Sequence, residues 1–196
     1  MFGSKAYRYI NSAIDISDGF YGDLSKILNG KFKSSKKVVL EEFLEGEELS
    51  YFVLVDKNSY SFFGSAQDHK KVGEGDTGLN TGGMGAYSPA RNLTDVLETK
   101  IRNKIIEPTL NAMKALGYPY TGFLYAGLMI KNDEPYLIEY NIRMGDPECQ
   151  VLMMKLKTDL LSIIEATRNN SLSKLKIKWD NKKCITIVLC DNGSPG

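Results

Sequence analysis

The stretch "TGFLYAGLMIKNDEPYLIEYNI", residues 121–142, decides the fold because it predicts two β-strands joined by a tight turn. Both halves are rich in aromatic and β-branched residues, which strands favour. Asn132 and Asp133, between the halves, are typical turn residues and indicate a β-hairpin. Side chains alternate between the two faces of a strand, so Glu139 and Asn141 are expected on the same face.

These two side chains have the chemistry of a magnesium site. A carboxylate and a carboxamide supply hard oxygen ligands, and Mg²⁺ takes one or two such protein ligands together with phosphates and water. Arg143 follows two residues later and is expected on the same face, where a guanidinium neutralises charge on a transferred phosphoryl group or clamps a carboxylate. The alternative is an ordinary half-exposed strand whose polar side chains face water.

Upstream, three segments read as strands, and the first two are joined by the acidic link "EGE" as an expected antiparallel pair. They are "KVVLEEFL" (37–44), "ELSYFVLVD" (48–56) and "YSFFGSAQ" (60–67). The acidic segment 41–48 would offer backbone groups to a purine and a carboxylate to ribose hydroxyls. Alternatively, it is a solvated acidic turn.

The segment 76–89, "DTGLNTGGMGAYSP", is unusually rich in glycine, and six glycines lie between Gly73 and Gly85. Glycine disfavours both helix and sheet interior, so we expect a long ordered loop whose backbone N–H groups approach an anion. The segment lacks the pattern of a Walker A motif or of a dinucleotide fingerprint. A merely flexible loop is the alternative.

The only histidine, His69, lies in "QDHKK" (67–71), a few residues before this segment. Its charged neighbours favour substrate anchoring, and a structural hydrogen-bonding role is the alternative.

The rest of the chain predicts helices and one more strand. Helical spacing of apolar residues begins after an N-cap at Thr94 or Asp95 and ends at Gly117, with a kink or break at Pro108. Further helices are expected from Pro147 to Leu156 and from Thr158 or Asp159 to about Thr167, and "KCITIVLC" (183–190) reads as a buried strand. Together these elements predict an α+β or α/β fold.

Composition limits the class of protein. The 196 residues suffice for one domain or for two small lobes around a cleft. Twenty-five basic and 24 acidic residues give a net charge of +1, so no global field attracts nucleic acid or an anionic membrane. Three cysteines without metal-type spacing suit reduced thiols, and no apolar run approaches the length of a membrane span. We therefore expect a cytoplasmic protein with small-molecule partners and an oligomeric state that the sequence leaves open.

From about Lys31 onward, four motifs are similar to those of the phosphoribosylamine–glycine ligase family of the ATP-grasp superfamily, in the same order and approximate spacing. They are "VVLEEFLEGEE", "SAQDHKKVGEGDTGLNTGGMGAYSP", "YTGFLYAGLMI" and "IEYNIRMGDPECQ". The resemblance implies a truncated ATP-grasp domain with a mixed, largely antiparallel sheet and flanking helices. It also implies an ATP-dependent reaction, with Mg²⁺ or Mn²⁺, that joins glycine to 5-phosphoribosylamine through a glycyl phosphate in purine biosynthesis.

The resemblance assigns roles to residues at the matching positions. The metal ligands would be Glu139 and Asn141, and the residues acting on the phosphoryl group and on glycine would be Arg143 and Asp146. ATP would be bound by Glu41, Glu42, Phe43, Leu44 and Glu48. The substrate side would be lined by Asp68, His69, Lys70, Asn80, Thr81, Gly82, Gly83, Met84 and Gly85.

Residues 1–30 do not fit this pattern. The stretch "INSAIDISDGFYGDLSKIL" (10–28) resembles a segment of thiamine-monophosphate kinase, in which Asp15, Ser17 and Asp18 would match a motif that binds magnesium and ATP. An ordinary capped amphipathic helix is the alternative. The sequence thus predicts a segment of different origin at 1–30 and a partial ATP-grasp domain at 31–196. A kinase-like phosphotransferase and a non-catalytic remnant of the fold are the alternative functions.

Overall fold

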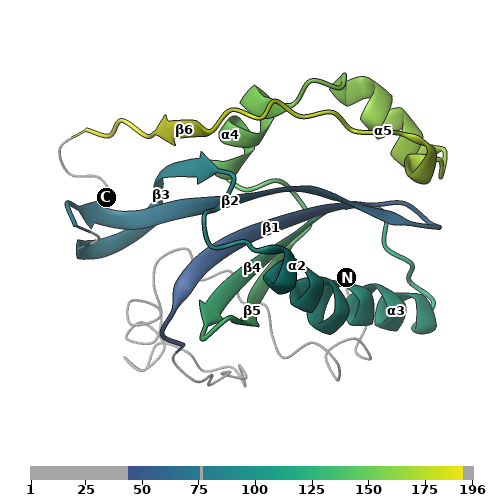
Figure 1. Cartoon of the computed structure of the whole chain (residues 1–196), viewed down its shortest axis with the longest axis horizontal. Helices are drawn as coiled ribbons and strands as arrows, with labels where there is room; N and C mark the ends of the chain where they lie inside the picture. Colours follow the sequence, from purple (N-terminus) through teal and green to yellow (C-terminus); the bar gives the residue numbers. More distant parts are fainter. Residues whose placement is uncertain (1–43, 76, 192–196) are drawn as a thin grey trace, which may run out of the picture.

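The computed structural model describes residues 44–75 and 77–191, and they form one six-stranded sheet with helices on both faces (Figure 1). The strand order is β5-β4-β1-β2-β3-β6, and every pair is antiparallel. The expected α+β class is confirmed. The strands are β1 (Glu47–Val55), β2 (Tyr60–Gly73), β3 (Thr77–Ser88), β4 (Gly122–Lys131), β5 (Glu134–Asn141) and β6 (Cys184–Ile187).

Strand β1 lies in the middle of the sheet and divides the core into two layers. Leu49, Tyr51 and Val53 face the layer formed by α2 (Asp95–Ile101), the π-helical segment η2 (Arg102–Ile106) and α3 (Glu107–Ala115). Phe52 and Leu54 face the other layer, under α4 (Glu148–Lys155) and α5 (Leu160–Arg168). Both faces of β1 are apolar because both are covered, as expected for a central strand.

The β4–β5 hairpin confirms the prediction from residues 121–142. Asn132 and Asp133 form its turn with φ angles of 54° and 58°, the left-handed region that a type I′ turn requires. Strand β4 also pairs with β1 along its whole length, from Glu47 opposite Ile130 to Val55 opposite Gly122. The hairpin is therefore anchored to the centre of the sheet.

The long helical segment after Thr94 also agrees with the sequence. The Thr94 side chain accepts a hydrogen bond from the Leu97 amide and caps α2. The break expected at Pro108 takes the form of η2, where the Glu107 amide bonds to the Arg102 carbonyl five residues back. Proline removes one helical donor and its ring crowds the preceding turn, which accounts for this widened turn before α3.

The glycine-rich segment was wrongly predicted as a loop, because residues 77–88 form strand β3. It pairs with β2 through a ladder whose register shifts twice, between His69 and Lys71 and between Lys71 and Gly73. Glycine serves close packing here, since a Cβ at Gly85 would lie 2.6 Å from the Thr186 carbonyl oxygen of β6.

The last strand was wrongly predicted as buried. Strand β6 lies at an edge of the sheet, and its side chains alternate between half-buried and exposed. Helix α4 begins at Glu148 with Pro147 at its N-cap, and α5 begins after Asp159, which accepts the Ser162 amide as a cap. Among the described residues, no helix is long and apolar enough to span a membrane. The strand predicted at 37–44 falls outside the described residues apart from its last position.

Candidate functional site

Glu139 and Asn141 lie on one face of β5, as expected, and the Asn141 Nδ2 donates to Glu139 Oε1 at 3.1 Å. Glu139 pairs with Gly127 of β4, and a Cβ at Gly127 would lie 3.1 Å from Glu139 Cγ. The missing side chain of Gly127 therefore leaves the room in which the Glu139 carboxylate lies. One bond between the pair leaves the second carboxylate oxygen and the amide oxygen available as ligands.

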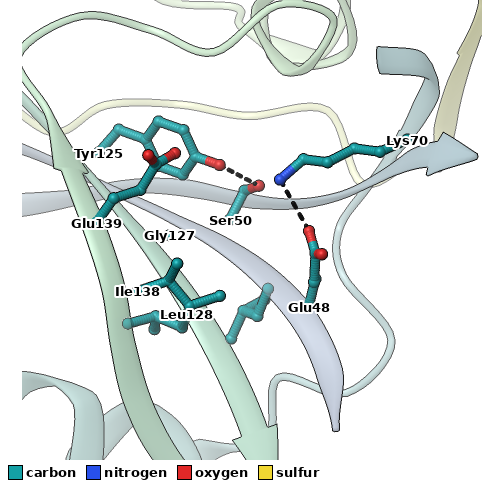
Figure 2. A pocket seen from close by; sticks show the side chains of 9 residues that line it. Glu48, Ser50, Lys70, Tyr125, Gly127, Leu128, Ile138 and Glu139 are labelled. Atoms are coloured by element: carbon teal, nitrogen blue, oxygen red, sulfur yellow. Dashed lines mark hydrogen bonds and ion pairs between the residues drawn. The ribbon is translucent and has the colours of Figure 1, made fainter. Parts of the chain in front are cut away.

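A small cavity adjoins this pair, and Figure 2 shows side chains of β1, β2, β4 and β5 around it. The Lys70 ammonium points toward Glu48, and the Tyr125 hydroxyl points toward Ser50 (Figure 2). Charged and apolar groups thus meet in one place. Its lining is Glu48, Leu49, Ser50, Lys70, Tyr125, Gly127, Leu128, Ile138 and Glu139.

Lys70 joins residues that the sequence assigned to two different subsites. Its Nζ lies 3.0 Å from Glu48 Oε2, on the expected ribose side, and 3.9 Å from Asp68 Oδ2. Burial lowers the pKa of Lys70, but the Asp68 and Glu48 carboxylates outweigh burial and raise it above its ordinary value. Lys70 therefore brings a fixed positive charge to the cavity.

Asp68 is a buried carboxyl, 8% exposed, beneath this lysine. Burial raises the pKa of Asp68 to about 7; the Lys70 ammonium opposes the rise, and the Glu148 and Glu48 carboxylates add to it. Burial outweighs the ion pair because a carboxylate loses more solvation than a partner 3.9 Å away restores. Asp68 is thus a proton-holding group near neutral pH.

Three residues of this region were missed by sequence reasoning: Glu148, Ser50 and Tyr125. Glu148 is only 2% exposed and accepts a hydrogen bond from Ser50 Oγ at 2.8 Å. Ser50 Oγ lies 3.1 Å from the Tyr125 hydroxyl. Burial, reinforced by Glu148, raises the pKa of Tyr125, so its hydroxyl stays protonated. In the sequence, only Glu148 lies in a motif, "GDPECQ", that could have pointed to a site. Ser50 and Tyr125 read as ordinary strand residues.

Arg143 and Asp146 follow the Glu139–Asn141 pair in the chain, beyond the end of strand β5. Strand β5 ends at Asn141, so Arg143 is not on the strand face as expected but in the bend that follows. Its guanidinium donates to the Met144 carbonyl at 3.0 Å. Asp146 is exposed and accepts from Gln150 at 2.7 Å. The exposed Arg143 side chain is thus held in this bend by a single local hydrogen bond.

The glycine-rich strand approaches the site through residues 81–83. The Thr81 hydroxyl donates to the Lys70 carbonyl at 2.9 Å and accepts from the Gly83 amide at 3.0 Å. The Gly83 amide therefore already has a hydrogen-bond partner within the strand and is not free to donate to an anion. A Cβ at Gly83 would lie 2.5 Å from Pro147 Cδ, which places this strand against the start of α4.

The other expected substrate residues are more dispersed. Asn80 and Gly82 are exposed, whereas Met84 and Gly85 belong to the contact with β6. The exposed His69 lies near Tyr87, with 5.8 Å between ring centroids. Leu44 is half-buried, and residues 41–43, expected with it to bind ATP, lie outside the described residues.

A larger cleft of about 340 Å³ lies elsewhere, between the β1–β2 turn and α3. It contains none of the predicted site residues, and its Asp56 and Glu107 carboxylates are bonded internally, Glu107 to the Tyr60 hydroxyl at 2.7 Å. The smaller cavity beside Glu139 is therefore the candidate site.

The antiparallel sheet that carries the acid–amide pair and the lysine beside one cavity has a fold that solved structures share. A phosphoribosylamine–glycine ligase from Thermotoga maritima matches with a TM-score of 0.66 and 32% identity, over 79% of this chain and 39% of that one. A biotin carboxylase complex from Campylobacter jejuni matches with a TM-score of 0.51 and 21% identity, over 74% and 30%, which shows the fold alone.

The chain belongs to the family of the phosphoribosylglycinamide synthetase ATP-grasp (A) domain, whose model matches residues 21–149. A phosphoribosylamine–glycine ligase from Rhizobium meliloti (strain 1021) is 45% identical over 195 residues, which are 99% of this chain and 46% of that protein. One from Vigna unguiculata is 46% identical over 197 residues, with 99% and 63% coverage. The chain thus spans about half the length of these curated relatives.

These alignments extend into residues 1–30, for which the sequence predicted a different origin, and the family model begins at residue 21. The described part of the chain does not include them. The separate origin of residues 1–30 stays a prediction, and the comparisons give no support to a kinase-like activity.

Proposed function

We propose that this chain is the nucleotide-binding part of a phosphoribosylamine–glycine ligase and binds ATP with Mg²⁺ or Mn²⁺ beside Glu139 and Asn141. In the whole reaction, ATP phosphorylates the carboxylate of glycine, and the amine of 5-phosphoribosylamine displaces phosphate. Family membership and relatives of that name support this proposal. A cytoplasmic location, with small molecules as the only partners, is part of the same proposal.

The observation that carries the proposal is the hydrogen-bonded acid–amide pair over Gly127. Within the described residues, no three or more His, Cys, Asp or Glu side chains lie together as a metal site made of protein ligands alone. Two oxygen ligands without a complete protein cage suit Mg²⁺, which keeps waters and takes phosphate oxygens as its remaining ligands. When bound, the metal would neutralise phosphate charge.

The other residues would position the reactants around this pair. Lys70 supplies positive charge for phosphate oxygens, held in place by Asp68 and Glu48. Glu48 would accept ribose hydroxyls, which requires it to share or release Lys70. Ile138, exposed in the cavity lining, offers an apolar surface for adenine, together with the backbone around Leu44.

Arg143 and Asp146 would act on the acceptor side after rearrangement. The present contacts of both side chains are local and solvent-exposed, and such contacts are readily exchanged for a ligand. We propose that Arg143 stabilises the phosphoryl group and that Asp146 orients the glycine ammonium. Residues 80–85, with Asp68 and His69, would form the wall on the substrate side.

Thermal unfolding with and without magnesium-ATP tests the nucleotide site. Binding to the folded state alone raises the thermal midpoint, and Glu139→Ala should abolish the rise. Glu134→Ala is the matched control on β5, because Glu134 bonds Lys100 and Lys104 outside the cavity. An unchanged midpoint in the parent protein would instead favour a non-catalytic remnant.

Turnover is a separate question from binding. The chain covers about half of its relatives, so we expect little or no ligase activity from it alone. Phosphate release that depends on both glycine and 5-phosphoribosylamine would contradict this expectation.

A further inference from the structure

Glu148, the first residue of α4, carries a buried charge that packing alone does not require. Its side chain is 2% exposed, and in the described part of the chain no lysine or arginine forms an ion pair with it. A carboxylate buried without a cation lowers stability, although the start of a helix partly compensates the charge. An apolar side chain at this position would pack α4 at least as well. The carboxylate therefore indicates a use outside packing.

The turn before α4 is shaped to hold this carboxylate in one place. The Cys149 amide donates to the Gly145 carbonyl at 2.8 Å in the first turn of the helix. A Cβ at Gly145 would lie 2.5 Å from Glu148 Cδ and closer still to Oε2. The missing side chain of Gly145 therefore leaves the room that the carboxylate occupies. With Oε2 over the glycine, Oε1 faces Ser50 of β1.

Hydrogen bonds run from Tyr125 through Ser50 to Glu148, and we call these three residues the relay. Ser50 Oγ donates to Glu148 Oε1 at 2.8 Å and lies 3.1 Å from the Tyr125 hydroxyl. A serine hydroxyl has one proton, and because this proton is directed at the carboxylate, Ser50 accepts from Tyr125. Burial, reinforced by Glu148, raises the pKa of Tyr125 and keeps this donor protonated. Figure 2 shows the phenol turned toward Ser50 at the wall of the cavity.

Tyr125 also forms part of the surface beneath the acid–amide pair. It lies opposite Asn141 in the β4–β5 ladder, as Gly127 lies opposite Glu139. Residues directly opposite each other in an antiparallel pair project from the same face, with Cβ atoms about 5 Å apart. The Tyr125 ring is 6% exposed and stacks on Phe52, with 4.7 Å between centroids and 25° between planes. A ring held this firmly limits where the Asn141 side chain can lie.

We propose that Glu148 is a positioning residue for magnesium-ATP. Through Ser50 it holds the Tyr125 ring, and the ring in turn keeps the Asn141 amide beside the Glu139 carboxylate. This inference rests on the proposed function, because it requires the acid–amide pair to take the metal. Since Glu148 opens α4, the relay also ties the docking of this helix to the geometry of the metal pair.

Two substitutions of nearly equal size isolate the middle hydroxyl of the relay. Ser50→Thr keeps the hydroxyl, whereas Ser50→Val replaces it with a methyl group and leaves the shape of the side chain the same as in Ser50→Thr. Titration calorimetry should show magnesium-ATP binding to Ser50→Val roughly tenfold more weakly than to Ser50→Thr. Thr167→Val is the matched control, because it removes a buried hydroxyl that donates to the Ile163 carbonyl on α5. It should bind magnesium-ATP as the parent protein does.

The metal dependence separates positioning from a general loss of structure. The relay acts on the metal pair, so the affinity for ATP in EDTA should be the same for Ser50→Thr and Ser50→Val. Circular dichroism should show the same fold for both variants. A merely structural hydroxyl would instead change stability, or would change the affinity equally with and without magnesium.

A double-mutant cycle tests whether the two ends of the relay act in series. Glu148→Gln removes the charge and Tyr125→Phe removes the donor, and each should weaken magnesium-ATP binding roughly threefold to tenfold. The double variant should bind no more weakly than the weaker of the two single variants, because either change already breaks the relay. The cycle does not depend on Ser50, so it decides the question even where Ser50→Val fails to fold.

Equal affinities of Ser50→Thr and Ser50→Val for magnesium-ATP would overturn this inference and leave the proposed function intact. Losses that add in the double variant, or a difference of the same size in EDTA, would also overturn it. A parent protein that binds no magnesium-ATP would overturn both proposals, because the relay would then have no metal pair to position.

Discussion

Replacing Asp68 with asparagine should remove a pH dependence of stability that this buried carboxyl imposes on the chain. Burial raises the pKa of Asp68 from 3.8 to about 7 despite the nearby Lys70 ammonium. The folded state therefore binds this proton more tightly than the unfolded state does between these two values. The resulting contribution to stability is complete below pH 3.8 and is lost as pH rises to about 7. Its size is up to about 4 kcal/mol, since one pKa unit corresponds to about 1.4 kcal/mol.

Urea unfolding of the parent and of Asp68→Asn, from about pH 4 to about pH 8, measures this contribution. The free energy of unfolding of the variant minus that of the parent should increase with pH and level off above about pH 7. Lys70 keeps Glu48 as a partner in both proteins. Its charge therefore contributes equally to both free energies of unfolding and cancels in their difference. Asp133→Asn, in the exposed hairpin turn, is the control and should follow the parent. A difference that stays constant within about 0.5 kcal/mol across this range would refute the reasoning.

Three further substitutions test the packing around the site. Gly83→Ala forces a Cβ against the Pro147 ring at a backbone φ of 133°, so urea unfolding should show a free energy of unfolding lower by about 1–3 kcal/mol. Gly82→Ala is the control, because a Cβ there meets open space, and it should change the free energy of unfolding by less than about 0.5 kcal/mol. Gly127→Ala should displace the Glu139 carboxylate, so calorimetry should show magnesium-dependent ATP binding weakened roughly tenfold. Circular dichroism should show that the fold is retained. An unchanged affinity would contradict the role of Gly127. Thr94→Ala should cost about 1 kcal/mol in thermal unfolding through loss of the α2 cap, and equal stability would show that the cap is replaced.

Local patterns predicted much of the fold because their physical causes are local. The Asn132–Asp133 turn, the cap at Thr94 and the period-two placement of Glu139 and Asn141 each depend on a few neighbouring residues. Such features need no knowledge of what packs against them.

The same reasoning failed where the outcome depends on distant contacts. Residues 77–88 form a strand despite their glycines, because β2 and β6 pair with them on both sides and need close backbone approach. The uncharged run at 184–190 contains the edge strand β6, Cys184–Ile187, and its burial was mispredicted because nothing in its own residues reveals its place in the strand order.

The candidate site divides in the same way. The amino-acid sequence by itself determined the hairpin, the acid–amide pair and the family resemblance, since these follow from residue order and spacing. Only the tertiary structure decided that Lys70 bridges Glu48 and Asp68, and that Glu148 is buried against Ser50, 98 residues away. These groups interact because antiparallel pairing and the docking of α4 bring distant segments together, and burial then sets which charges and protons they hold.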